Sequence, residues 1–73
     1  MNRYRDLHGG SGVVAYELLP AGIRVMFRNR ETYTYTEASA GREAVATMQS
    51  LAEAGRGLST FISQQQPRYE PKE

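Results

Sequence analysis

The sequence predicts an α+β domain: a three-stranded antiparallel β-meander with one amphipathic helix packed on one face and a short C-terminal helical turn. Two observations carry this prediction. Residues 23–28 and 32–36 alternate strictly from one position to the next, which is the period of half-buried strands. From residue 39 to residue 54 the apolar residues recur instead at three- and four-residue intervals, as on one face of a helix. These residues are Val45, Met48, Leu51 and Ala52. A sheet with one apolar face and a helix with one apolar stripe bury each other.

The first strand is expected over residues 13–19 and leads into a tight turn. Pro20 presets φ and Gly22 permits positive φ, so both residue types suit such a turn. The second strand, 23–28, and the third, 32–36, are joined by only three residues. Links this short between consecutive strands favour an antiparallel meander.

The alternation also assigns side chains to faces. One face of the second strand carries Ile23, Val25 and Phe27, and the other carries Arg24, Met26 and Arg28. Tyr33 and Tyr35 are the most apolar residues of the third strand, so the core interpretation places them on the helix side with their hydroxyls at the rim. The alternative places them on an exposed sheet face, where paired aromatic rings can stack unpaired bases. The sequence leaves both interpretations open.

The helix is expected to begin at Ser39, whose hydroxyl can accept a backbone N–H of the first turn, and to end at Gly55, a left-handed cap. Leu58, Phe61 and Ile62 then indicate a short helical turn that closes the core. We therefore assign the domain to residues 13–63.

The two ends of the chain have a different composition. Residues 1–12 are polar and then glycine-rich, and we expect a flexible lead-in. Residues 64–73 are polar and punctuated by proline, and we expect a mobile tail.

The 73-residue chain carries nine basic and eight acidic residues, a formal net charge of +1. This balance gives no bulk argument for nucleic-acid binding, which usually needs a strongly basic domain or a clustered basic face. Eight of the nine basic residues are arginine, which favours planar contacts with phosphate or bases. The chain has no cysteine, no apolar run near the roughly 18 residues of a membrane span, and no apolar region typical of a signal peptide at its start. We expect a cytoplasmic protein without membrane contact.

The sequence offers no arrangement of residues for catalysis. A hydrolase or transferase needs a nucleophile with a base within hydrogen-bond reach. The single histidine, His8, lies in the glycine-rich lead-in, and no two carboxylates are spaced for acid–base work or for a metal. We expect a non-enzyme with no metal and no cofactor.

The order of strands, Tyr-x-Tyr motif, helix and glycine resembles the KTSC domain, a family named after the C-terminus of some lysyl-tRNA synthetases and also found as stand-alone small bacterial proteins. The resemblance runs from Ser11 to about Tyr69. The residues that carry it are Ser11, Tyr16, Ile23-x-Val25-x-Phe27, Tyr33-Thr34-Tyr35, Gly55, Phe61-Ile62 and Tyr69. The resemblance implies a domain without catalytic residues, and the synthetase context of the family implies RNA as the ligand.

Two functions follow as hypotheses. The first is an RNA-binding module for tRNA-like or single-stranded RNA, in which arginines hold phosphates and the Tyr-x-Tyr motif stacks bases. Its candidate residues are Arg24, Arg28, Arg30, Tyr33, Tyr35 and Arg56. The second is a protein-interaction or structural module that forms a homodimer or binds another protein, with Tyr33 and Tyr35 in the core. Exposure of the tyrosines separates the two, because stacking needs an accessible ring.

Overall fold

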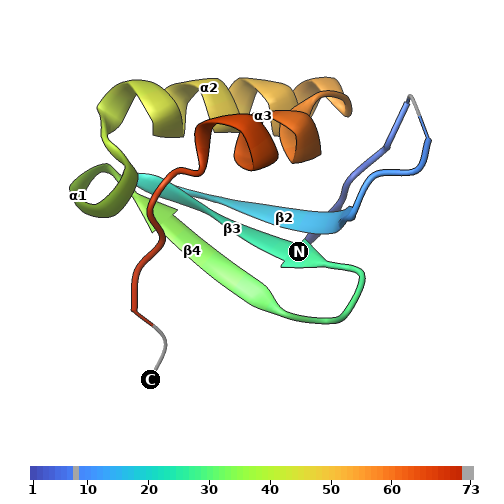
Figure 1. The fold of residues 1–73 in the computed structure, drawn as a ribbon, viewed down its shortest axis with the longest axis horizontal. Coiled ribbons are helices and arrows are strands. Elements are labelled where there is room, and N and C mark those ends of the chain that lie inside the picture. Colours follow the sequence, from blue (N-terminus) through green and yellow to red (C-terminus); the bar gives the residue numbers. More distant parts are fainter. Residues whose placement is uncertain (8, 72–73) are drawn as a thin grey trace.

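The computed structural model describes residues 1–7 and 9–71, which form an antiparallel sheet with helices on one of its faces (Figure 1). The described strands are β1 (Asn2–Arg3), β2 (Val13–Leu19), β3 (Gly22–Phe27) and β4 (Thr32–Thr36), and they lie in the order β1-β2-β3-β4. The described helices are α1 (Glu37–Ala40), α2 (Arg42–Ala54) and α3 (Leu58–Gln65). The predicted α+β class and antiparallel arrangement are confirmed. The predicted count is wrong, because the sequence predicts three strands, one helix and a short C-terminal helical turn, whereas the described residues contain four strands and three helices. The predicted C-terminal turn corresponds to α3.

The additional strand comes from the segment predicted as a lead-in. In β1, Asn2 pairs with Tyr16 and Arg3 with Ala15 on the outer edge of β2. Tyr4 follows on the inner face of the sheet, is only 3% exposed, and accepts a hydrogen bond on its hydroxyl from the backbone N–H of Leu58 at 3.2 Å. Residues 1–12 therefore supply a strand and a core side chain. Residue 8 of this segment lies outside the described residues.

The helical region begins earlier than predicted and is divided in two. Thr36 caps α1, and Ser39 is the third residue of that helix, where its hydroxyl accepts the backbone N–H of Thr36 at 3.0 Å. This reciprocal pair is a capping box, with serine in place of the usual glutamate. Gly41 then turns the chain at φ 95° before α2 begins. The predicted cap at Gly55 is confirmed, with φ 75° in the left-handed region.

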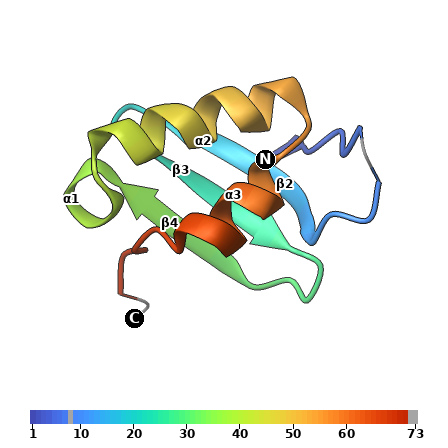
Figure 2. The same cartoon turned by 45° about the horizontal axis from the view of Figure 1, so that its top comes forward.

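Helices α2 and α3 pack on the same face of the sheet and enclose the core (Figure 2). The buried residues of the core are Tyr4, Val13, Ile23, Val25, Tyr35, Met48, Ala52 and Leu58.

Gly22 has a role in the packing of the sheet that differs from the predicted one. Its φ is not positive; instead, a Cβ atom at this position would overlap the carbonyl oxygen of Tyr35 on the adjacent strand. The close approach of β3 to β4 therefore requires glycine.

The strand register places both tyrosines of β4 on the helix side of the sheet. Tyr35 lies opposite Ile23 and Tyr33 lies opposite Val25, and directly opposed residues point to the same face. Tyr35 is 2% exposed, which confirms the core interpretation for this residue. Tyr33 is only half-buried.

The chain beyond α3 runs along the free edge of β4. Gln66 ends α3 at φ 47°, and the backbone N–H of Glu70 donates to the carbonyl oxygen of Thr34 at 2.7 Å. The ring of Tyr69 lies against Tyr33, with centroids 4.6 Å apart. The described part of the predicted tail thus contacts the sheet. Residues 72 and 73 lie outside the described residues.

Candidate nucleic-acid interface

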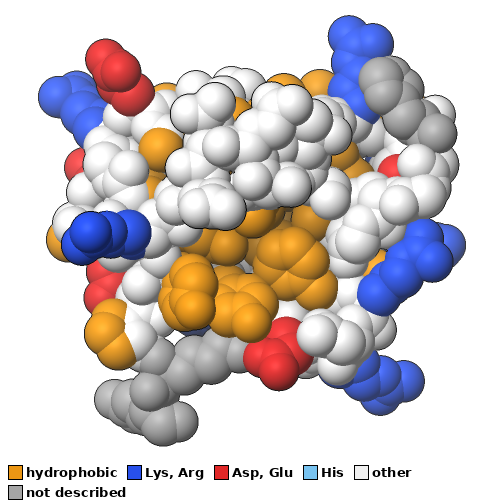
Figure 3. Space-filling view, viewed as in Figure 1, with side chains coloured by type: hydrophobic (Ala, Val, Ile, Leu, Met, Phe, Trp, Pro, Cys, Tyr) orange, Lys and Arg blue, Asp and Glu red, His pale blue; other side chains and the backbone are white. Residues whose placement is uncertain are grey.

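Most of the arginines gather at one end of the sheet, although the whole chain is nearly neutral. This end is formed by the N-terminal segment, the turn between β3 and β4, and the C-terminal end of α2 (Figure 1). Figure 3 shows basic side chains along this edge, on the right of the view. The arginines concerned are Arg3, Arg5, Arg28, Arg30 and Arg56. We call this region the arginine end.

Three of these arginines line one cavity of about 370 Å³, which we call the arginine cavity. Its lining residues are Arg3, Tyr4, Arg5, Asp6, Val13, Val14 and Arg28. The cavity forms where β1 passes the start of β2, next to an irregularity in the β2–β3 register between Val13 and Ala15. Such bulges redirect the side chains beside them. Three arginines and one aspartate therefore line the same space.

Local hydrogen bonds fix two of the arginines. Arg28 donates from its backbone N–H to the carbonyl oxygen of Gly12 at 2.8 Å and from Nε to the carbonyl oxygen of Ser11 at 3.0 Å. The guanidinium of Arg5 donates to the carbonyl oxygen of Glu53 in the last turn of α2. Positive charge is favourable at a helix C-terminus. Each guanidinium keeps further N–H groups for a ligand, because arginine carries five donors.

The one acidic group in the arginine cavity is engaged in the loop. The carboxylate of Asp6 accepts the backbone N–H of Ser11 at 3.2 Å, and Asp6 itself has a left-handed φ of 54°. This contact closes the loop that carries the glycines. The remaining charge of the cavity is positive, with three arginines against one aspartate.

A second, smaller cavity of about 140 Å³ adjoins the first and shares Tyr4 and Asp6 with it. We call it the glycine cavity. Its other lining residues are Gly9, Gly10, Ser11, Arg56, Gly57, Ser59 and Thr60. Hydroxyl groups and glycine backbone line this space, and Arg56 adds a positive charge. The two cavities together form a continuous polar surface along the N-terminal segment.

The predicted site residues are only partly brought together. Arg28, Arg30 and Arg56 lie at the arginine end. Arg24 lies on the sheet face opposite the helices, where its guanidinium pairs with the carboxylate of Glu17 at 2.7 Å. Among the tyrosines, Tyr35 is buried and Tyr33 lies at the rim, so the pair does not form one exposed stacking surface.

Sequence reasoning missed Arg3 and Arg5, which line the arginine cavity. The alternation Arg3-Tyr4-Arg5 is the signal that could have found them. In an extended segment it places the tyrosine on one side and both arginines on the other.

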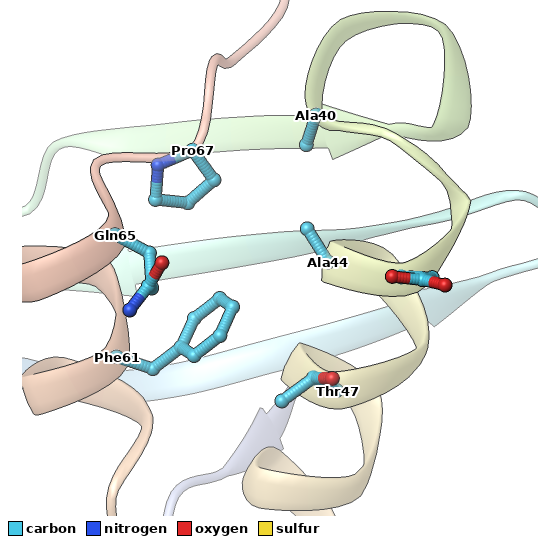
Figure 4. Close-up of a pocket in the computed structure, with 7 residues that line it drawn as sticks. Ala40, Ala44, Thr47, Phe61, Gln65 and Pro67 are labelled. Atoms are coloured by element: carbon cyan, nitrogen blue, oxygen red, sulfur yellow. The ribbon is translucent and has the colours of Figure 1, made fainter.

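A third pocket, of about 360 Å³, lies between α2 and α3 and is shown in Figure 4. The ring of Phe61 faces Ala44 and Thr47 across it, while Gln65 and Pro67 close one side. Glu43 is its one titratable lining residue. This pocket is therefore a groove between two helices.

The chain has no match among family models, curated proteins or solved structures. Within residues 1–7 and 9–71, no three histidine, cysteine or carboxylate side chains cluster as metal ligands would. In the same residues, no helix is long and apolar enough to cross a membrane.

Proposed function

We propose that this protein is a small non-catalytic RNA-binding module, acting in the cytoplasm, that holds phosphate groups in the arginine cavity. The observation that carries the proposal is the convergence of Arg3, Arg5 and Arg28 on one cavity. Guanidinium groups bind phosphate oxygens through paired, charge-assisted hydrogen bonds, and several around one space suit a phosphate backbone.

The distribution of charge supports this function better than the net charge does. A local cluster of one sign creates a field that attracts an oppositely charged ligand, even when the whole chain is almost neutral. Arg30 and Arg56 extend the positive surface on either side of the cavity. The resemblance to the KTSC domain, through its synthetase context, favours RNA as the nucleic acid.

The proposal is tested by fluorescence anisotropy with a labelled short single-stranded RNA and a labelled RNA hairpin, in a salt series from about 50 to about 200 mM. The test variant is R3Q/R5Q/R28Q. The control is R24Q/R42Q, which removes two charges outside the two polar cavities. Thermal unfolding of both variants confirms that they are folded.

We expect the wild-type affinity to fall steeply with salt. Loss of three phosphate contacts should reduce the slope of log K against log salt by about 2 for single-stranded RNA. The control variant should keep most of the slope. Equal losses in both variants, or no wild-type binding at low salt, would contradict the proposal.

A second candidate function is a protein-interaction module that dimerises through the open face of the sheet. Helices α2 and α3 lie on one face of the sheet. The opposite face carries the cross-strand pairs Glu17–Arg24 and Met26–Thr32. In a dimer with a two-fold axis, a surface of one protomer meets the same surface of its partner. Glu17 of one protomer could therefore pair with the partner's Arg24, and the reverse. Light scattering of the wild type and of Met26→Glu tests this candidate. A dimer that becomes a monomer on substitution supports it, and a wild-type monomer at high concentration excludes it.

A further inference from the structure

Three aromatic rings form a row beside the arginine end, on the edge of the helix-covered face. We call Phe27, Tyr33 and Tyr69 the aromatic row. The centroids of Phe27 and Tyr33 are 5.5 Å apart with the rings nearly perpendicular, and those of Tyr33 and Tyr69 are 4.6 Å apart at 56°. The rings come from the end of β3, the start of β4 and the segment that follows α3.

The aromatic row is accessible to solvent. Tyr69 is 50% exposed, and Phe27 and Tyr33 are half-buried. Figure 3 shows a hydrophobic hollow on this side of the molecule, below α3. Tyr35, only two residues from Tyr33, is buried and presents no ring to solvent.

Two exposed arginines are next to residues of the aromatic row in the chain. Phe27 directly precedes Arg28, which lines the arginine cavity, and Arg68 directly precedes Tyr69. Two acidic residues lie nearby. The carboxylate of Glu70 accepts a hydrogen bond from the hydroxyl of Thr36, and Glu31 shares its turn with Arg28 and Arg30.

We propose that the aromatic row stacks unpaired bases of a single-stranded nucleic acid whose phosphates occupy the arginine cavity. This inference rests on the proposed function and adds the class of ligand. Stacking platforms beside a basic groove are typical of proteins that bind single strands, because every base has a π-face. A duplex hides its base faces within the helix, so it would contact only the arginines.

The proposal assigns the bases and the phosphates to different residues. Phosphate contacts give the salt dependence, whereas base stacking gives a preference for single strands that salt does not remove. The two contributions can therefore be measured separately.

The experiment compares Tyr69→Ala with Tyr69→Phe, which keeps the ring and removes only the hydroxyl. Tyr69 is half-exposed, so both variants should fold, and thermal unfolding verifies this. The probes are a single-stranded RNA of about ten nucleotides and a duplex of the same sequence, within the length range that such surfaces cover. Anisotropy gives the affinity for each probe at several salt concentrations.

We expect Tyr69→Ala to weaken binding of the single strand about tenfold, with an unchanged salt slope and little change for the duplex. Tyr69→Phe should bind like the wild type. Because the chain has no tryptophan, Tyr69→Trp adds one fluorophore, and bound single strand should quench it more than bound duplex does.

Equal effects of Tyr69→Ala on single strand and duplex would overturn the stacking proposal, and so would no effect on either. If R3Q/R5Q/R28Q still loses affinity in that case, the phosphate-binding function stands without stacking. If the wild type binds neither probe at low salt, the proposed function fails and the stacking proposal fails with it.

Discussion

Tyr33 and Tyr35 stand two residues apart on one face of one strand, yet their environments differ. Tyr35 lies under the helices and is 2% exposed, and burial raises its pKa to about 12, helped by Tyr33 and Tyr69 nearby. Tyr33 lies at the rim, in ring contact with Phe27 and Tyr69. The cover provided by the helices, rather than residue type or strand face, decides which tyrosine stabilises the fold and which can meet a ligand.

The same contrast holds between the core and the arginine end. The core consists of apolar side chains and tyrosines drawn from the sheet, α2 and α3. The arginines of the arginine end are exposed, and two of them, Arg5 and Arg28, donate to backbone carbonyl groups. Substitutions in the core should change stability, whereas substitutions at the arginine end should change binding and leave the fold intact.

The largest effect is expected from truncation of the buried tyrosine. Tyr35→Ala should destabilise the domain by about 3–5 kcal/mol, because it leaves a cavity among Ile23, Met48 and their neighbours. A small domain has a low free energy of unfolding, so this variant should be largely unfolded. Tyr33→Ala should lower the free energy of unfolding by much less. Urea unfolding followed by circular dichroism measures both, and a fully stable Tyr35→Ala would show that the core assignment is wrong.

A smaller effect is expected where β3 approaches β4. Gly22→Ala should cost about 1–3 kcal/mol, because the added Cβ overlaps the backbone of Tyr35 and the strands must move apart. Gly12→Ala is the matched control, since its Cβ would meet Phe27 and Ser59 at an ordinary 3.9 Å. Thermal unfolding should separate the two variants. Similar melting temperatures would contradict the close strand packing.

Because the pKa of Tyr35 is raised, the free energy of unfolding should depend on pH in the alkaline range. In the unfolded chain a tyrosine loses its proton near pH 10, whereas the pKa of folded Tyr35 is about 12. The stability that the folded state gains from protonated Tyr35 is therefore fully present below pH 10 and is lost as the pH rises toward 12. Melting temperatures between pH 9 and pH 11 should fall more for the wild type than for Tyr35→Phe, which has no proton to lose. Parallel curves would indicate that Tyr35 titrates normally.

The smallest effect concerns the attachment of the N-terminal segment. Tyr4→Phe keeps the buried ring but removes the acceptor for the N–H of Leu58, which should cost about 1 kcal/mol. Tyr16→Phe is a suitable control, because it removes a hydroxyl from a half-buried tyrosine of the sheet. The rate of hydrogen exchange at the Leu58 amide measures how much this hydrogen bond protects it. Unchanged exchange in Tyr4→Phe would mean that this hydrogen bond does not protect the amide.

The sequence was sufficient for the elements that have a clear period. Alternation predicts β2, β3 and β4, and the apolar stripe with Gly55 predicts most of α2. Alternation alone leaves open which face Tyr35 takes, and the pairing of β3 with β4 decides it. Strand β1 could not be predicted, because two residues define no period and their pairing depends on distant contacts. The separation of α1 from α2 depends on the φ of Gly41. A glycine inside a helical pattern is compatible with a break or with a continuous helix, so the pattern alone does not decide between them.

The candidate site was predicted less completely than the fold. Local clustering, which is visible in a sequence, indicates Arg28 and Arg30, and Arg56 is added as a residue expected to lie near them. Arg24 was named with them, although the β2–β3 register places it opposite Glu17. Arg3 and Arg5 reach the cavity only because β1 joins the sheet. Charge pairing and long-range convergence both depend on register, which strand periodicity alone does not fix.

An NMR titration of the labelled protein with short single-stranded RNA, at low and physiological salt, tests RNA binding at the arginine cavity most directly. We expect salt-sensitive shifts at Arg3, Arg5 and Arg28 and around the glycine cavity, with further shifts at the aromatic row. The amides of Glu17 and Arg24 on the open sheet face should stay unchanged. Shifts confined to that open face, or no shifts at low salt and high RNA concentration, would contradict RNA binding at the arginine cavity.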